Sequence, residues 1–275
     1  MNRFYLIFLL LSSPIFFILS DEIKSPQPKE TQELDSVDSI QLLNSSEKSV
    51  WYATESEIDP EKFSGKLNSD WEAYSVPGVF SSKKNPKKNY KTLWILKKFT
   101  IQNEWKSGQI AIRLGVISDR DQAYLNGKLI GKNGDFNAST PQAYDKIRIY
   151  KIPDNLLRAQ KENILLVKIG SYFPEEIGLT QDFTSIGPSD LIEKDFYHTE
   201  YFKLILLMIY FTAGGYFLFL FIRRRKEYEN LFFGLFTFAL VVYQFLRNQI
   251  KYDLNFEFYT LKKIEYMVLP LLIPI

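Results

Sequence analysis

The sequence predicts an all-β sandwich domain followed by transmembrane α-helices. Over residues 49–189, short apolar runs recur between Gly, Pro, Asn and Asp residues, at the spacing typical of an all-β fold. From Tyr201 onward this pattern gives way to apolar runs, the first of which is long enough to cross a bilayer core of ~20 residues. We therefore expect the first region to fold in water and the second in lipid.

The first residues have the pattern of a secretory signal peptide, which we assign to residues 1–20. Arg3 precedes an apolar run, and Ser20 is small enough for a cleavage site. Ile18 departs from the small residue expected there, so an uncleaved anchor stays an alternative. Residues 21–48 are rich in Ser, Gln, Glu, Lys and Pro, and this composition predicts a disordered linker because it offers little apolar surface to bury.

Alternation of apolar residues predicts the strands of the β domain. In "GQIAIRLGVI" the apolar side chains recur at every second position, which predicts one buried and one wet face. Asn126-Gly127, between apolar flanks, is the strongest short-range indication of a hairpin, because both residues tolerate positive φ. "KIRIYKIP" and "NILLVKIG" predict two further strands, and "LWILKKFTI" predicts a central strand that is buried on both faces.

The C-terminal region contains three apolar runs after a polar linker over residues 190–200. Residues 201–222 are long enough to span a bilayer, and residues 231–246 are at the short end of the range. Gly214 and Gly215 would allow close contact between helices. The third run, residues 264–275, is about half of a span, so we expect the front part of a longer membrane protein, truncated in this chain.

The basic residues predict how the chain is oriented in a membrane. Four of them follow the first span directly: Arg223, Arg224, Arg225 and Lys226. Such clusters lie on the cytoplasmic side of membrane proteins, and export by a signal peptide also puts the β domain outside. We therefore expect a multi-pass protein of the bacterial inner membrane with an extracytoplasmic β domain, and the lipid bilayer is its first expected partner.

The composition excludes several classes of function. Lys plus Arg (34) nearly balance Asp plus Glu (32), so no basic field attracts nucleic acid. The chain has no Cys and one His, His198, which excludes disulfides, Cys-ligated metals and His-rich metal sites. We therefore predict no metal, no cofactor and no nucleic-acid partner, while a homodimer stays open.

Three motifs resemble a known β-sandwich family. Residues 105–108, 121–127 and 150–163 match, in order, the "W-x-G" turn, the "D-x-x-x-V-Y-L-N-G" hairpin and the "Y-x-I-P" element of the galactose-binding-like jelly roll in glycoside hydrolase family two. Two departures fall in turns, at residues 106–108 and 160–161. The resemblance implies a jelly-roll sandwich and a sugar ligand. It implies no enzyme activity in this chain, because catalysis in that family belongs to a separate barrel domain.

The membrane region resembles a second family. The stretch from "DFTSIGPSDLIEK" through "RRRKEYENLFFGLF" looks like the opening of bacterial seven-transmembrane receptors with diverse intracellular signalling modules. The resemblance implies a sensing domain outside the cell and an output domain, absent from this chain, that is a kinase, cyclase or phosphatase. The alternative is a membrane-anchored carbohydrate-recognition module of a cell-envelope enzyme such as a glycoside hydrolase.

Sugar sites on β-sandwiches combine an aromatic surface with a few polar groups. The candidates in this sequence are Trp94, Trp105, Tyr124, Asp119, Arg120 and Asp121. Core packing is the alternative role for Trp94, and a solvated loop is the alternative for residues 119–121. The sequence therefore predicts a small-molecule or carbohydrate site near the start of the hairpin.

Overall fold

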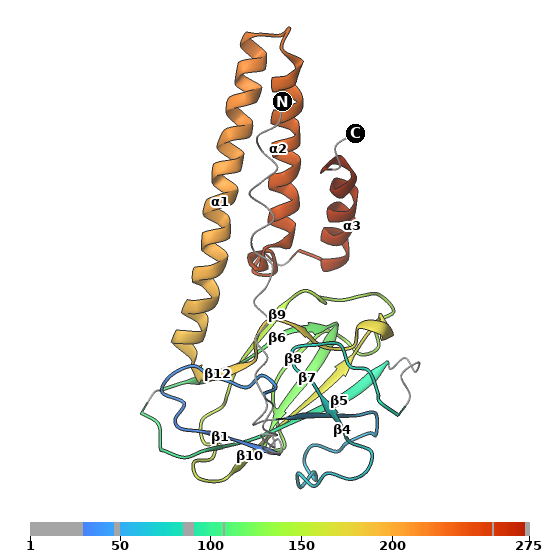
Figure 1. Cartoon of the computed structure of the whole chain (residues 1–275), viewed down its shortest axis with the longest axis vertical. Helices are drawn as coiled ribbons and strands as arrows, with labels where there is room; N and C mark the ends of the chain where they lie inside the picture. Colours follow the sequence, from blue (N-terminus) through green and yellow to red (C-terminus); the bar gives the residue numbers. More distant parts are fainter. Residues whose placement is uncertain (1–29, 47–49, 85–90, 107, 255, 273–275) are drawn as a thin grey trace, which may run out of the picture.

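The computed structural model describes residues 30–46, 50–84, 91–106, 108–254 and 256–272. A β domain forms one end of the molecule, and two long helices rise side by side from it (Figure 1). The predicted signal peptide, residues 1–20, lies outside the described residues, as does the first part of the predicted linker.

The β domain contains two sheets. The larger sheet has the order β4-β3-β5-β10-β7-β8, with β1 paired in parallel to β5. Its strands are β1 (Thr31–Leu34), β3 (Trp51–Thr54), β4 (Glu72–Tyr74), β5 (Thr92–Ile101), β7 (Arg120–Leu125), β8 (Lys128–Asn133) and β10 (Glu162–Gly170). The smaller sheet has the order β11-β6-β12-β2, with β9 paired to β6. Its strands are β2 (Gln41–Leu42), β6 (Ile110–Ser118), β9 (Ile147–Lys151), β11 (Gly178–Gln181) and β12 (Ser185–Pro188).

One hydrophobic core joins the two sheets. Ile95 and Phe99 of β5 and Val167 of β10 belong to the same buried cluster as Ile112 and Leu114 of β6. These residues alternate along each strand, because side chains in a strand point to opposite faces in turn. The predicted all-β domain is confirmed at this level, whereas its finer assignment as a jelly roll stays a prediction.

Two strand predictions have different outcomes. The Asn126-Gly127 hairpin is confirmed, since both residues have positive φ, 49° and 85°, between β7 and β8. The wet face predicted for β6 is wrong, because every residue of the strand is buried. The helix α1 packs against this strand, and Arg113 on that face contacts Asp195 of α1 at 3.0 Å. The alternation of residues along β6 does not reveal that a helix covers its second face.

The disordered linker predicted over residues 21–48 is wrong for its described part. Strands β1 and β2 lie in this segment and pair with the two sheets. Leu34, Val37 and Leu43 are at most 3% exposed in the main core. Few apolar residues are present, but these three are buried, so the β domain includes residues 30–46.

The C-terminal region is helical. Its elements are α1 (Ser189–Arg223), α2 (Tyr228–Arg247), η2 (Gln249–Tyr252), α3 (Phe258–Val268) and η3 (Leu269–Leu272), and a further short turn, η1 (Pro174–Glu176), lies in the β domain. Helices α1 and α2 are long and apolar enough to cross a bilayer. The predicted linker at 190–200 is wrong as a separate segment, because it forms the first turns of α1, which begins directly after Pro188 of β12.

Glycines let α1 and α2 approach each other. A Cβ atom on Gly214 would lie 3.2 Å from the ring of Phe238, and one on Gly234 would lie 2.7 Å from Leu218. A Cβ atom on Gly215 would meet nothing within 4 Å. The predicted helix contact therefore holds for Gly214 and not for Gly215.

Candidate functional site

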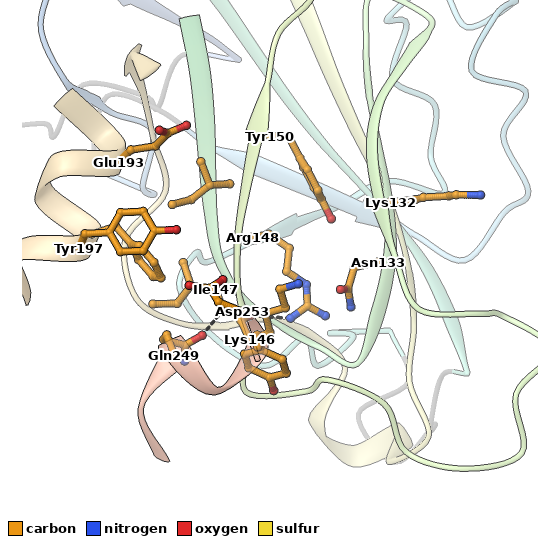
Figure 2. Close-up of a pocket in the computed structure, with 13 residues that line it drawn as sticks. Lys132, Asn133, Lys146, Ile147, Arg148, Tyr150, Glu193, Tyr197, Gln249 and Asp253 are labelled. Carbon is orange, nitrogen blue, oxygen red and sulfur yellow. Dashed lines mark hydrogen bonds between the residues drawn. The ribbon is translucent and has the colours of Figure 1, made fainter. Parts of the chain in front are cut away.

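A cavity of about 310 Å³ lies where the β domain meets the helices. Its volume is at the lower end of the range of small-molecule sites. The residues that line it come from β8, β9, the segment before β9, α1 and η2 (Figure 2): Lys132, Asn133, Lys146, Ile147, Arg148, Ile149, Tyr150, Glu193, Phe196, Tyr197, Gln249, Tyr252 and Asp253. The cavity therefore has walls from both regions of the chain.

The helix wall follows from the helical repeat. Glu193, Phe196 and Tyr197 are three and four residues apart on α1, so they share one face of that helix. Phe196 and Tyr197 contact each other edge to face, with ring centroids 5.1 Å apart. This face gives the cavity two adjoining aromatic rings.

The strand wall is fixed by a buried carboxylate. Asp121 of β7 accepts hydrogen bonds from Arg148 Nε at 2.8 Å and from the Tyr150 hydroxyl at 2.5 Å. Burial raises the pKa of Asp121, although the guanidinium of Arg148 and the hydroxyl of Tyr150 oppose this shift. Arg148 also donates to the Asp119 carbonyl at 2.6 Å. Arg148 and Tyr150 are therefore held in one orientation beside the cavity.

Lys146 adds positive charge to the cavity, whereas the side chain of Lys132 points away from it (Figure 2). Among the residues that the structure describes, no ion pair involves Lys132 or Lys146. The ammonium of Lys146 lies 5.3 Å from the centre of the Tyr252 ring. Burial, together with the nearby Arg148 guanidinium, lowers the pKa of Lys146. Aromatic rings, amides and unpaired cations are the groups that bind a hydroxyl-rich or anionic ligand.

The predicted polar site residues are engaged inside the protein. Asp119 and Asp121 are fully buried, and Arg120 is 5% exposed. Asp119 accepts from Arg120 Nε at 2.9 Å and from the backbone amide of Gln142 at 2.8 Å. Arg120 donates to the carbonyls of Asp135 and Ala138, both at 2.9 Å. Asp119 and Arg120 hold the loop between β8 and β9, Asp121 holds side chains of β9, and none of the three lines the cavity.

Two of the three predicted aromatic residues, Trp94 and Tyr124, lie together, and Trp105 lies elsewhere. Trp94 is 2% exposed in a second apolar cluster, where its ring centroid lies 6.0 Å from that of Tyr124. Its indole Nε1 is buried without a hydrogen-bond partner in the described structure. Trp105 packs against the main core. The six candidates thus occupy three places, and sugar binding by them stays a prediction.

The residues around the cavity were not singled out by the sequence reasoning. Lys146 and Tyr150 belong to a segment expected only to be a strand, and Tyr197 belongs to the segment expected to be a linker. The pair Phe196-Tyr197 beside Glu193 carries a helical spacing that could have indicated a cavity wall. Within the described residues, no group of three or more His, Cys, Asp or Glu side chains is placed to hold a metal ion.

A cluster of charges joins the β domain to the helical region beside this cavity. Asp145, just before β9, contacts Lys251 Nζ at 2.8 Å and Lys262 Nζ at 2.7 Å. Burial would raise the pKa of Asp145, but these two ammonium groups outweigh it and the pKa is lowered. Glu200 of α1 accepts from the backbone amide of Gln249 at 2.9 Å. We call these five residues the Asp145 cluster.

One side chain connects the cluster to the cavity. The amide of Gln249 accepts from the backbone N–H of Ile147 at 3.0 Å (Figure 2). It also donates to the carbonyl of Asp145 at 2.7 Å. A second cavity, of about 800 Å³, adjoins the first and shares Ile147, Phe196 and Gln249 with it. Both cavities therefore border the contact between strand β9 and η2.

The fold defined by these elements is a two-sheet β domain followed by an apolar helix pair. No protein-family model and no curated protein sequence matches the chain. Solved structures similar to it include a β-glucuronidase from Bacteroides uniformis, which is 20% identical over 54% of this chain and 18% of its own, with a TM-score of 0.41. A β-glucuronidase from Faecalibacterium prausnitzii is 17% identical over 48% of this chain and 21% of its own, with a TM-score of 0.37.

A glycosyl hydrolase family 2 member from Bacteroides cellulosilyticus is 17% identical over 54% of this chain and 20% of its own, with a TM-score of 0.42. The chain spans about a fifth of the length of these solved structures.

Proposed function

We propose that this chain is the N-terminal part of a bacterial membrane signalling receptor. In this proposal its β domain, a jelly roll, senses a small polar ligand of the carbohydrate class outside the cell. The ligand occupies the cavity between β9, α1 and η2, and its binding acts through the helices on a cytoplasmic output domain that is not in this sequence.

The observation that carries the proposal is that one cavity is lined by both regions of the chain. Tyr150 comes from the β domain, Tyr197 from α1 and Tyr252 from η2. A ligand that touches all three has an affinity that depends on how these elements are arranged. By reciprocity, its binding then biases that arrangement, which is what a receptor requires.

The chemistry of the lining supports a carbohydrate ligand. Tyr197 and Phe196 offer apolar ring faces, and Asn133 and Lys146 offer hydrogen-bonding groups. Sugars present an apolar face together with a ring of hydroxyls, and they bind where both kinds of group converge. Lys146, which forms no ion pair within the described residues, favours a sugar that carries an acidic group, although the carboxylates of Glu193 and Asp253 also line the cavity.

The length of α1 and α2 and the basic residues between them support the membrane arrangement. Helix α1 ends at Arg223, so the four basic residues of 223–226 lie at the end remote from the β domain. In a membrane this arrangement matches an external β domain and a cytoplasmic turn.

Calorimetric titration of the full chain in detergent tests the proposal. The probes are a neutral, an acidic and an N-acetylated monosaccharide: galactose, glucuronate and N-acetylglucosamine. We expect saturable binding of at least one of these sugars. Tyr197→Ala should lower the affinity about tenfold or more, because it removes a ring worth about 1–3 kcal/mol of packing. His198→Ala, which changes a neighbour outside the cavity, should leave the affinity unchanged. Absence of binding would overturn the assigned ligand class.

The same preparation separates the receptor from the alternative of an anchored carbohydrate-recognition module. A receptor requires that sugar binding slow amide hydrogen exchange at η2 and the adjoining end of α2, because the ligand couples these segments to β9. A recognition module predicts protection confined to the β domain.

A further inference from the structure

A further groove lies between the two long helices, apart from the proposed sugar cavity and adjoining the 800 Å³ cavity at Lys203 and Arg247. A groove of about 340 Å³ is lined by Lys203, Leu206, Leu207 and Tyr210 of α1 and by Gln244, Arg247 and Asn248 at the end of α2. Its cationic groups are at one end, and its apolar side chains extend away from them along α1.

The apolar wall has the geometry of a continuous stripe. On α1, Leu207 and Tyr210 lie four and seven residues after Lys203. The three side chains therefore share one face over about 10 Å of helix length. Leu206 is 39% exposed and Tyr210 is 41% exposed, so the stripe is open on its outer side. An extended apolar chain fits such a surface.

The two cations of the groove have different partners. Lys203 is paired with Glu200, which also accepts from the Gln249 amide. Arg247 donates to the neutral hydroxyl of Tyr243 at 2.8 Å, and within the described residues no ion pair involves it. Lys203 and Arg247 are the charged residues that line the groove, so the lining itself is positive, and Glu200 beside Lys203 and the more distant Glu265 and Asp145 offset part of this charge. A guanidinium without a carboxylate binds phosphate well, because its fork of N–H groups matches two phosphate oxygens.

The groove is at the level of lipid headgroups if α1 and α2 span a bilayer, and the inference rests on that part of the proposed function. Lys203 lies near the start of the apolar run of α1, and Arg247 is the last residue of α2. Both are at the end of the helix pair that meets the β domain. Tyr and basic side chains at such a position anchor a helix at the interface.

We propose that this groove binds one anionic phospholipid from the leaflet next to the β domain. Its phosphate lies between Lys203 and Arg247, and one acyl chain lies along Leu206, Leu207 and Tyr210. A lipid with a net negative headgroup is favoured over a zwitterionic one, because the positive end of a choline headgroup would be repelled by the same two cations.

Native mass spectrometry of the full chain, delipidated in detergent, tests the site. Phosphatidylglycerol and phosphatidylcholine of equal chain length are the probes, and glycerol phosphate is the headgroup without chains. We expect phosphatidylglycerol to bind several-fold more tightly than phosphatidylcholine and glycerol phosphate not to compete. Arg247→Gln should lower affinity roughly five- to tenfold, as expected for the loss of a charge-assisted contact.

Two further variants keep the test decisive. Leu206→Trp fills the groove without changing a charge and should also lower phosphatidylglycerol binding. Lys194→Gln removes an exposed charge of α1 outside the groove and should leave binding unchanged. Equal binding in wild type and Arg247→Gln, or an equal loss in Lys194→Gln, would overturn the proposal.

The outcome is separable from that of the proposed function. Flotation of the wild-type chain with phosphatidylcholine vesicles reports whether the helices insert at all, and sugar titration reports on the other cavity. A chain that floats and binds sugar but does not discriminate between the two phospholipids contradicts the lipid site alone.

Discussion

The carboxylate of Asp145 in the β domain lies 2.8 Å from the ammonium of Lys251 in η2, a lysine that is only 1% exposed. Lys262 of α3 contacts the same carboxylate oxygen, and Tyr252 donates its hydroxyl to the other. One loop residue of the β domain therefore neutralises charge in two helical elements. Asp145 therefore contributes to the contact between the two regions, together with the Arg113–Asp195 ion pair.

Replacing Asp145 should weaken that contact strongly. Asp145→Asn leaves the buried ammonium of Lys251 without the carboxylate it contacts, while Lys262 keeps Glu265 at 2.6 Å, and loss of one partner of a buried pair costs about 3–5 kcal/mol. We expect a lower thermal unfolding temperature and faster amide hydrogen exchange over residues 143–147 and 249–252. Asp154→Asn, at an exposed position, is the matched control and should change neither quantity.

Acid should produce the same weakening in the wild-type chain. The pKa of Asp145 is lowered on folding, so its contribution to stability is complete above the unfolded pKa of about 3.9 and is lost as pH falls through the lower folded value. The difference in unfolding temperature between wild type and Asp145→Asn should therefore be constant from pH 7 to about pH 5 and shrink below about pH 4. A difference that persists unchanged at pH 2 would contradict this assignment.

Alkali should stabilise the β domain through Lys97. This side chain of β5 is fully buried, and desolvation lowers its pKa from 10.5 to about 7. Between these two values the unfolded chain binds the proton and the folded chain does not, so unfolding becomes less favourable as pH rises. Lys97→Met removes this titration. The unfolding temperature of wild type relative to Lys97→Met should rise from pH 7 to pH 9.5 and be flat below pH 6.

Widening the contact between α1 and α2 should destabilise the helix pair. Gly234→Leu introduces a side chain whose first carbon would already lie 2.7 Å from Leu218, and overpacking of this kind costs about 1–3 kcal/mol. Gly215→Leu adds the same side chain where nothing lies within 4 Å. Unfolding by sodium dodecyl sulfate, followed by circular dichroism, should show a loss for Gly234→Leu only, and equal losses would argue against close packing at Gly234.

Local sequence patterns correctly predicted the elements whose structure depends mainly on neighbouring residues in the chain. The hairpin at Asn126-Gly127 follows from the backbone angles that these residues tolerate, and the apolar helices follow from their composition. The strands β5 and β10 follow from runs of apolar residues. None of these predictions needs knowledge of what lies across the core.

The site depends on contacts between distant segments, and the sequence does not show them. Asp145 and Lys251 are more than a hundred residues apart, and neither stands out in composition. Asp119 and Asp121 were predicted to be polar groups of a sugar site, with a solvated loop as the alternative. They are buried because Arg120 and Arg148 lie against them, and only the folded chain shows that pairing.

The junction between β12 and α1 has a mechanical consequence. Because the helix starts at Ser189, directly after the strand ends at Pro188, no free joint separates sheet from helix. A straight helix of this kind acts as a lever arm about 50 Å long, at 1.5 Å per residue for its 35 residues. Tilting the sheet by only about 5° would swing the far tip by roughly 4–5 Å, on the scale of one helical turn.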